Sequence, residues 1–376
     1  MLMLLILLLS MSINIDCKFY CFLRVYFMRI YALLICFCLL NNSAVASFFA
    51  LSDYHRFGPM TNRSQNPIYL LFLDESLERG AASLKKNDWH LSLDTVFSNI
   101  LEKDCFYKEQ SYCYINNGES IDIDAELWRT SFKAAYGVSD IFSVGMEVPF
   151  FSYSGGFLDE FINDFHHFFG FPNGGRELID NYRLVYKIRK GKASYRPQVK
   201  NFGLGDLIFW NKLQVIHESQ LIPALSLKAS LKLPTGSPNH ATGSGTPDIA
   251  LSAYLEKSYQ RFHSYSHLGV IVMGGMKSLN PILNVAQLSF GQAFEINVTE
   301  YLSFIGQVKG NTPILKNIKS DEFAWPVLDL SFGFTGDVPV SNQGVKIHYE
   351  FAFSEDVLCG GPSVDFSVFF KTGVVF

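Results

Sequence analysis

Two adjacent histidines offer the most reactive side chains in the sequence. His166 and His167 lie in the segment 155–176, which reads GGFLDEFINDFHHFFGFPNGGR. Neighbouring side chains on a helix point about 100° apart, so this pair is poorly placed to hold one metal ion. A serine hydrolase would need a nucleophile bonded to one histidine, and no G-x-S-x-G motif accompanies them. We therefore predict no catalytic, metal or cofactor site and expect the protein not to be an enzyme.

Two glycine-rich segments raise a second kind of chemistry, the binding of phosphate. They are residues 203–206 (GLGD) and residues 236–248 (GSPNHATGSGTPD). A phosphate-binding loop opens a helix, and neither segment is followed by a helical pattern. We interpret both as tight turns at strand ends, where glycine supplies positive φ angles.

The segment that carries the histidines is predicted to be an amphipathic helix in a long extracellular loop. Its apolar residues recur at helical spacing, and Pro172 with the glycines after it ends the pattern. The helix could fold into a channel mouth, lie on the outer leaflet, form a lid, or pack against the rim, which is the usual role of such a stripe. The candidate gating or plug residues are Phe157, Leu158, Asp159, Phe161, Ile162, Phe165, His166, Phe169 and Arg176.

Alternation of apolar and polar residues is the strongest pattern in the remainder of the chain. Between residues 225 and 233, leucines and an alanine occupy one face, and serines and lysines occupy the other. The same alternation recurs at 142–150, 328–334 and 345–353. Repeated from strand to strand, this is the pattern of a membrane barrel with lipid outside and a wet lumen inside. The candidate lumen-facing residues, which would tune selectivity, are Lys228, Lys232, Lys346, His348 and Glu350.

The predicted fold class is all-β: an antiparallel transmembrane β-barrel of 12–14 strands over residues 89–376. If the first strand runs outward, the short connections fall on the periplasmic side and the long ones outside, as in known barrels. The count is 12 if the hairpin near 182–200, which contains Pro197, is not embedded in the membrane. The strands are expected near 89–101, 121–136, 141–154, 182–190, 192–200, 205–217, 221–234, 247–258, 264–275, 283–297, 301–310, 324–336, 344–355 and 363–376.

Composition and the N-terminal residues agree with a secreted barrel. The chain is 48% hydrophobic and 15% aromatic but only 18% charged, and its net charge of −4 argues against nucleic acid as a partner. Residues 1–46 are predicted to be a signal peptide region, with the effective signal at 28–46 and a doubtful extension at 1–27. Residues 47–88 would form an N-terminal periplasmic or lumenal segment. A soluble β-sandwich is the alternative reading of the strands.

The last residues and the cysteines complete the sequence pattern. Phe376 ends a strand whose alternate residues are apolar, which is similar to the C-terminal signature that outer-membrane barrels present to their assembly machinery. Cys105, Cys113 and Cys359 follow the signal region. Two of them could form a disulfide, within the first long loop or to Cys359, or all could stay unpaired.

Several short motifs together resemble domain-of-unknown-function family 3187, a family of proteobacterial secreted proteins. They are the run 155–176, Asn66-Pro67, GLGD at 203–206, KLPTG at 232–236 and SVDF at 363–366. KLPTG followed by GSGTPD is shared with a wider set of barrels, some linked to uptake of aromatic compounds. The resemblance implies an outer-membrane barrel and carries over no activity and no catalytic residue.

These observations lead to one functional expectation and two alternatives. We expect a channel or transporter in the bacterial outer membrane for small molecules, including hydrophobic ones. Its partners would be outer-membrane lipid, the barrel assembly machinery and a small-molecule solute. The alternatives are a structural or lipid-interacting barrel without a pore, and an outer-membrane hydrolase.

Overall fold

A computed structural model describes most of the chain after residue 54. The described residues are 55–81, 84–103, 119–169, 179–199, 202–316, 325–340, 344–356, 364 and 366–376. The predicted signal region 1–46, Arg176 and the three cysteines after the signal region lie outside these residues. No helix in the described part is long and apolar enough to cross a membrane.

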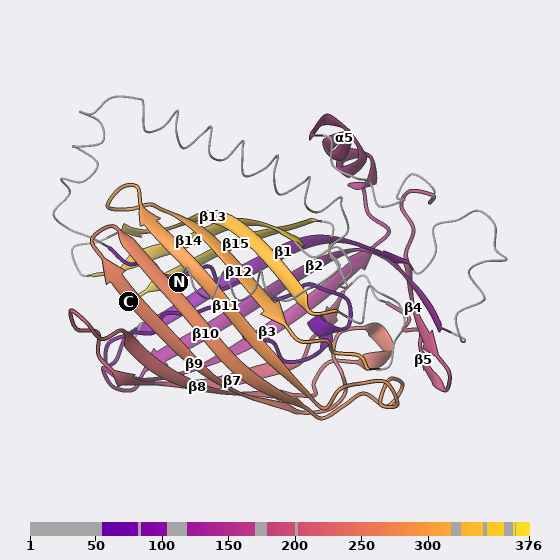
Figure 1. Cartoon of the computed structure of the whole chain (residues 1–376), viewed down its shortest axis with the longest axis horizontal. Coiled ribbons are helices and arrows are strands. Elements are labelled where there is room, and N and C mark those ends of the chain that lie inside the picture. Colours follow the sequence, from indigo (N-terminus) through magenta and orange to yellow (C-terminus); the bar gives the residue numbers. More distant parts are fainter. Residues whose placement is uncertain are drawn as a thin grey trace, which may run out of the picture. The chain divides into compact units, whose positions relative to one another are not determined.

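Twelve antiparallel strands close into a barrel, at the lower end of the predicted count (Figure 1). Each strand pairs with its neighbours in the chain, and the last pairs with the first: Thr95 lies opposite Phe370. Closure leaves no open edge in the barrel wall. The strands are β1 (Trp89–Lys103), β2 (Glu119–Gly137), β3 (Phe142–Ser154), β7 (Leu207–Ile216), β8 (Ala224–Leu233), β9 (Asp248–Tyr259), β10 (Phe262–Met273), β11 (Ala286–Asn297), β12 (Ser303–Asn311), β13 (Val327–Pro339), β14 (Lys346–Asp356) and β15 (Phe366–Val375).

The hairpin predicted near 182–200 extends one wall beyond the barrel instead of adding two strands to it. Its strand β4 (Val185–Lys190) pairs with the first residues of β2, and β5 (Ala193–Tyr195) pairs with β4. On the same side of β2, β3 pairs with it as far as Glu126, and β4 pairs with it from Asp124 to Glu119. The short strand β6 (Gly203–Leu204) then pairs with the end of β3.

A helix is present in the segment predicted to be helical. It is α5 (Asp159–Phe169), and it belongs to an excursion that leaves the wall after β3 and returns at β4. Figure 1 shows α5 standing clear of the barrel wall, above the part where β4 and β5 extend it. An extracellular position of α5 stays a prediction.

The barrel is polar inside and apolar outside, the reverse of a soluble protein. On β8, Ser226, Lys228, Ser230 and Lys232 are buried, and Leu227 between them is half exposed. The pattern repeats along the other strands: Leu251 on β9 is 65% exposed, for example. On β8 and β9, burial therefore follows the period of two that the sequence shows.

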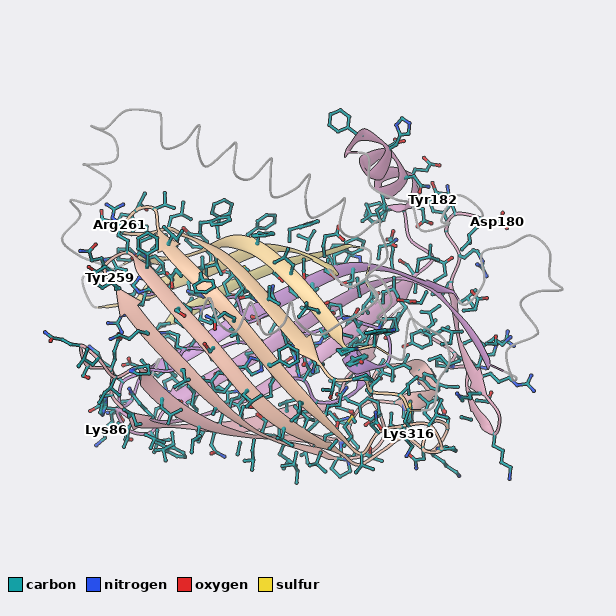
Figure 2. The ribbon with its side chains drawn as sticks, in the orientation of Figure 1. Lys86, Asp180, Tyr182, Tyr259, Arg261 and Lys316 are labelled. Carbon is teal, nitrogen blue, oxygen red and sulfur yellow. The ribbon has the colours of Figure 1, made fainter. Side chains whose placement is uncertain are left out.

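The two ends of the barrel differ in their connections. One end, here called the turn end, carries the short connections 138–141, 260–261 and 298–302 and the terminal Phe376. The other, the loop end, carries the longer connections, such as 234–247 and 274–285. In Figure 2, Lys86, Tyr259 and Arg261 mark the turn end, and Lys316 and Tyr182 mark the loop end.

Candidate functional site: the filled lumen

Residues 55–81 occupy the barrel lumen, and we call them the lumenal segment. The segment ascends from the turn end along β11, β12 and β14, turns at the short helix η1 (Tyr69–Leu71), and descends along β9, β8 and β7. Nearly all of its residues from 58 onward are buried. Its backbone–backbone hydrogen bonds in the described part, such as Leu70 N to Asn66 O, run within the segment, so side chains make its polar contacts with the wall.

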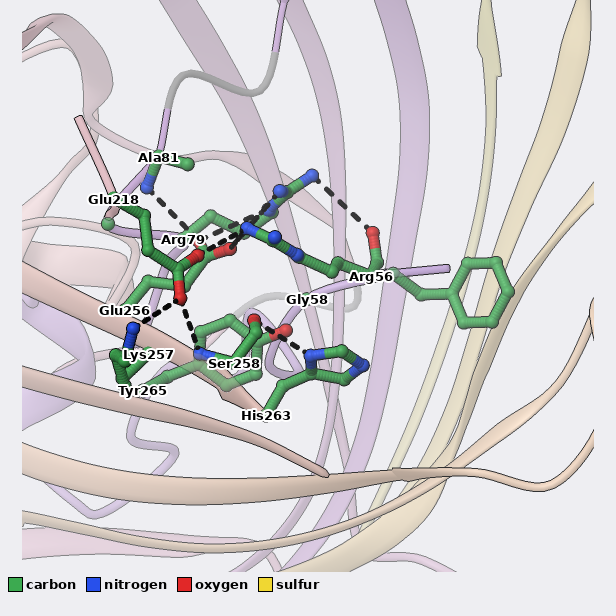
Figure 3. A network of polar contacts seen from close by, with 12 residues as sticks. Arg56, Gly58, Arg79, Ala81, Glu218, Glu256, Lys257, Ser258, His263 and Tyr265 are labelled. Carbon is green, nitrogen blue, oxygen red and sulfur yellow. Dashed lines mark hydrogen bonds and ion pairs between the residues drawn. The ribbon is translucent and has the colours of Figure 1, made fainter. Parts of the chain in front are cut away.

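At the turn end, Glu256 on β9 holds both arms of the segment (Figure 3). Its fully buried carboxylate accepts hydrogen bonds from Arg56 Nη1 at 3.3 Å, Arg79 Nη2 at 3.2 Å and the Ala81 backbone N–H at 3.0 Å. A second carboxylate, Glu218, lies 2.6 Å from Arg56 Nη1. Buried charges are tolerated where they are paired and hydrogen-bonded, so this cluster ties the two ends of the lumenal segment to one point.

In the middle of the lumen, two lysines of the wall bind two glutamates of the lumenal segment. Lys228 Nζ lies 3.0 Å from Glu75 and 2.5 Å from Glu78, and Lys212 Nζ lies 3.5 Å from Glu78. Tyr254 donates a further hydrogen bond to Glu75 at 2.9 Å. Burial alone would raise the pKa of Glu78, but Lys228 and Lys212 lower that pKa to about 2. Glu78 is therefore ionised at neutral pH.

The ascending arm uses a matching set of contacts on the opposite wall. Gly58 N–H donates to Glu295, Met60 exchanges two hydrogen bonds with Gln307, and Thr61 N–H donates to Glu350. Glu350 in turn accepts from Lys371 Nζ at 2.9 Å. The arm is thus held at successive levels from the turn end to mid-lumen.

Two inward-facing glycines let apolar side chains of the lumenal segment reach the wall. A Cβ on Gly333 would come within 2.6 Å of Met60 Sδ, and a Cβ on Gly291 would come within 3.1 Å of Leu77. Met60 and Leu77 are both fully buried, and they share a small apolar cluster with wall residues such as Phe369. The wall is therefore shaped around this segment.

At the loop end, Lys232 of the KLPTG motif contacts both glycine-rich segments, GLGD and GSGTPD. Its ammonium lies 2.7 Å from Asp206 of the GLGD turn, 2.9 Å from Asp248 and 2.5 Å from Ser244 Oγ of the GSGTPD loop. It also donates to the backbone carbonyl of Leu71 at the tip of the lumenal segment. We name this cluster the Lys232 latch, comprising Lys232, Asp206, Asp248, Ser244 and the Leu71 carbonyl.

An apolar layer covers the latch at the loop end. Residues 68–73 of the lumenal segment pack there with buried residues of the loops, including Ala241, Met276, Ile282 and Ile314. Tyr69 also donates a hydrogen bond to the Thr312 carbonyl. The tip of the segment is thus set in an apolar layer above a charged lumen.

Four of the five predicted lumen-facing residues contact the lumenal segment or a residue that binds it. Lys228 and Lys232 bind the segment directly, and Glu350 accepts from Thr61. His348 bonds Asp337 and Glu350, and Lys346 is exposed at the end of β14. Any effect of these residues on selectivity stays a prediction.

Some of the predicted plug residues contact the rim of the barrel, among those whose contacts the structure describes. Phe157 and Leu158 donate backbone N–H groups to Glu126 of β2, and Asp159 accepts from Asn99 of β1. Ile162 is buried, whereas Phe157 is 63% exposed. The side chains of Phe161, Phe165, His166 and Phe169, like the whole of Arg176, lie outside the described part. A gating role of α5 stays a prediction, and the segment that fills the lumen is a different one.

The sequence allowed a lumenal position for residues 47–88 but did not indicate that residues 55–81 fill the barrel. The lumenal segment carries charges of both signs, Arg56, Arg63 and Arg79 against Asp74, Glu75 and Glu78, within a stretch that lacks a strand pattern. Their complementarity to inward lysines and glutamates of the strands was the available signal. Among the described residues, no group of three or more histidine, cysteine, aspartate or glutamate side chains is arranged to hold a metal ion.

The fold and its contents define a class: a twelve-stranded β-barrel with a charged lumen that an N-terminal segment fills. A family model described as "Protein of unknown function (DUF3187)" matches residues 32–371. The chain belongs to this family, which confirms the resemblance seen in the sequence motifs. A search of curated proteins finds no match to the chain.

Barrels of known structure are similar to this chain in architecture. The COG4313 outer membrane channel from Pseudomonas putida F1 is 13% identical over 78% of this chain and 97% of that chain, with a TM-score of 0.47. The NanC porin is 7% identical over 76% and 98%, with a TM-score of 0.41. A Pseudomonas aeruginosa FadL homologue is 9% identical over 86% and 99%, with a TM-score of 0.34. At such identities and scores the likeness decides neither a solute nor a mechanism.

Proposed function

We propose that this protein is an outer-membrane channel for small molecules that is closed by the lumenal segment and opens when the segment is withdrawn. The turn end would face the periplasm. The observation that carries the proposal is the path of residues 55–81: both arms meet at Glu256, at the same end of the barrel. A segment that enters and leaves at one end can be withdrawn without cutting a strand.

The outer face supports a place in a membrane. Large apolar side chains point outward on strands around the barrel, including Phe132, Leu268, Phe294 and Phe351, each about half exposed. Exposed aromatic residues such as Trp89 gather at the turn end, where barrels carry an aromatic belt. An outer surface of this kind is stable against lipid rather than water.

The contacts of the lumenal segment support its release as a unit. Side-chain ion pairs and hydrogen bonds hold it to the wall, whereas backbone ladders hold the strands to one another. Water that enters the lumen can replace the side-chain contacts one at a time, because each group exchanged is polar. The apolar tip at residues 68–73 supports solutes with an apolar part, since a solute at the loop end meets this layer.

A barrel without a pore is the second candidate, and the filled lumen is the observation that favours it. In that case the charged network would only stabilise the barrel, and the outer face would serve structure or lipid binding. We propose further that the chain has no catalytic activity, that its last strand is recognised by the barrel assembly machinery, and that lipid is its permanent partner.

The deciding experiment is single-channel recording in planar bilayers. The whole mature chain should be electrically silent, and deletion of 55–81 should produce discrete conductance steps. Substitution of both Arg56 and Arg79 by alanine is a milder second variant, because it frees the turn end without shortening the chain. We expect this variant to open intermittently. Heat-modifiable migration on gels checks that each barrel is folded.

Either outcome is informative. Steps in both variants establish a channel that the lumenal segment closes. Silence from folded barrels that lack residues 55–81 contradicts the channel and leaves the barrel without a pore.

A further inference from the structure

The lumenal segment does not fill the barrel evenly. Toward β7–β10, large inward side chains such as Lys212, Lys228, Tyr254 and Tyr265 are buried against it. Toward β13–β15, three inward positions near the loop end are serines instead: Ser331, Ser354 and Ser367. A serine fills far less of the lumen than a tyrosine or a lysine, so space remains on this side.

Two cavities occupy that space and meet at common residues. The first is lined by the three serines together with Asn66 and Asp329. The second is lined by Thr61, Asp94, Lys133 and Lys371 among others. Asn62, Arg63 and Phe369 line both cavities. Each cavity has room for only about one or two water molecules.

The pair of cavities follows the middle of β15. Lining residues on this strand run from Ser367 to Lys371, and Val364 lines the first cavity from just before the strand. Four residue steps along a strand correspond to roughly 14 Å. Phe369 lies within this stretch and lines both cavities.

Unpaired amide atoms show that this side of the lumen is suited to polar molecules. Among the described residues, Asn62 Nδ2, Gln65 Oε1 and Asn66 Oδ1 are buried without a hydrogen-bond partner. All three side chains line the first cavity and are more than nine-tenths buried. Buried amide groups need partners, and a small hydroxylic molecule can serve both a donor and an acceptor.

Most of the charges around the cavities are balanced in pairs, and the carboxylate of Asp329 accepts hydrogen bonds from the Asn66 amide. Lys371 is paired with Glu350, Arg129 with Glu147, and Lys309 with Asp74. An ion that entered so narrow a space would lose most of its hydration and meet partners that are already bound, which is costly. An uncharged polar molecule loses less and gains the amide groups.

We propose that these two cavities form one hydrated path that carries water and other uncharged polar molecules of similar width past the lumenal segment while that segment stays in place. Phe369 sets the width of the path. The proposal concerns the closed barrel, so it depends on the membrane location but not on withdrawal of the segment.

The test measures water flux by stopped-flow light scattering of proteoliposomes after an osmotic step. The whole mature chain should speed shrinkage several-fold over lipid alone and remain electrically silent in a planar bilayer. Ser354→Leu should bring the rate down toward that of lipid, because leucine fills the first cavity. Ser354→Ala is the matched control, since it removes the hydroxyl but keeps the space, and its rate should stay near that of the unchanged chain.

A second variant tests the path in the opposite direction. Phe369→Ala should raise the water rate and admit glycerol, which the unchanged chain should exclude. Equal rates for the unchanged chain, the alanine variant at 369 and lipid alone would overturn the proposal, and so would a flux that Ser354→Leu leaves intact in a folded barrel. Failure of the deletion of 55–81 to conduct ions would contradict the channel function but not this path.

Discussion

Lys232 is an inward-facing residue that both stabilises the loop end of the barrel and holds the lumenal segment. Between Asp206 and Asp248 it forms ion pairs with two buried carboxylates, and through the Leu71 carbonyl it reaches the lumenal segment. The same alternation that predicted its inward position says nothing about these partners. The GLGD and GSGTPD motifs, interpreted as tight turns, also supply ligands for this one ammonium group.

The first prediction concerns this latch. Lys232→Met should lower the free energy of unfolding by about 3–5 kcal/mol, because it leaves buried carboxylates without their cation. Urea titration followed by gel mobility measures the loss. Lys346→Met is the control, since Lys346 is exposed at the end of a strand, and it should change stability by less than about 0.5 kcal/mol. Equal stabilities for the two variants would show that the Lys232 latch does not contribute to the free energy of unfolding.

At the scale of elements, two segments compete for the role of closing the barrel. The amphipathic stripe of 155–176 favoured α5, whereas the structure fills the lumen with residues 55–81. The base of α5 is fixed to the rim through Glu126 and Asn99, and Phe168 of the helix is 82% exposed. An apolar stripe predicts that a helix packs somewhere, but it does not identify the surface.

The second prediction separates the two segments. Deleting 157–171 should leave the barrel folded and electrically silent, because the lumenal segment still fills it. The measurement is the planar-bilayer recording proposed above, with the deletion of 55–81 as the comparison. Conductance steps that arise on loss of 157–171 alone would restore the gating role predicted from the sequence.

For the whole molecule, closure of the barrel depends on its first and last strands. Trp89 and Phe376 exchange two backbone hydrogen bonds, of 2.8 Å and 3.0 Å, and the ladder continues from there to Asn99. Phe376 therefore helps to close the barrel, in addition to the role in assembly that the pattern of the last strand predicts.

The third prediction uses this double role. Deletion of Phe376 should cost the refolded barrel only about 1–3 kcal/mol, the value of two hydrogen bonds, but should sharply lower its amount in the outer membrane of cells. Quantitative blotting of membrane fractions compares the deletion with Phe376→Tyr, which keeps an aromatic end. Unchanged membrane levels after the deletion would argue against recognition of the last residue.

Sequence by itself determined the all-β barrel class, and it indicated which stretches form strands and which of their faces are polar. Those features are local, because the side of the wall that a residue faces follows from its position within a strand. Tertiary structure decided that β4 and β5 extend beyond the barrel, since both hairpins and barrel strands alternate. It also decided that residues 55–81 fill the lumen and that Glu256, Lys228 and Lys232 hold them there. Ion pairs between residues more than a hundred positions apart have no period along the chain, so only the closed barrel reveals which charges meet.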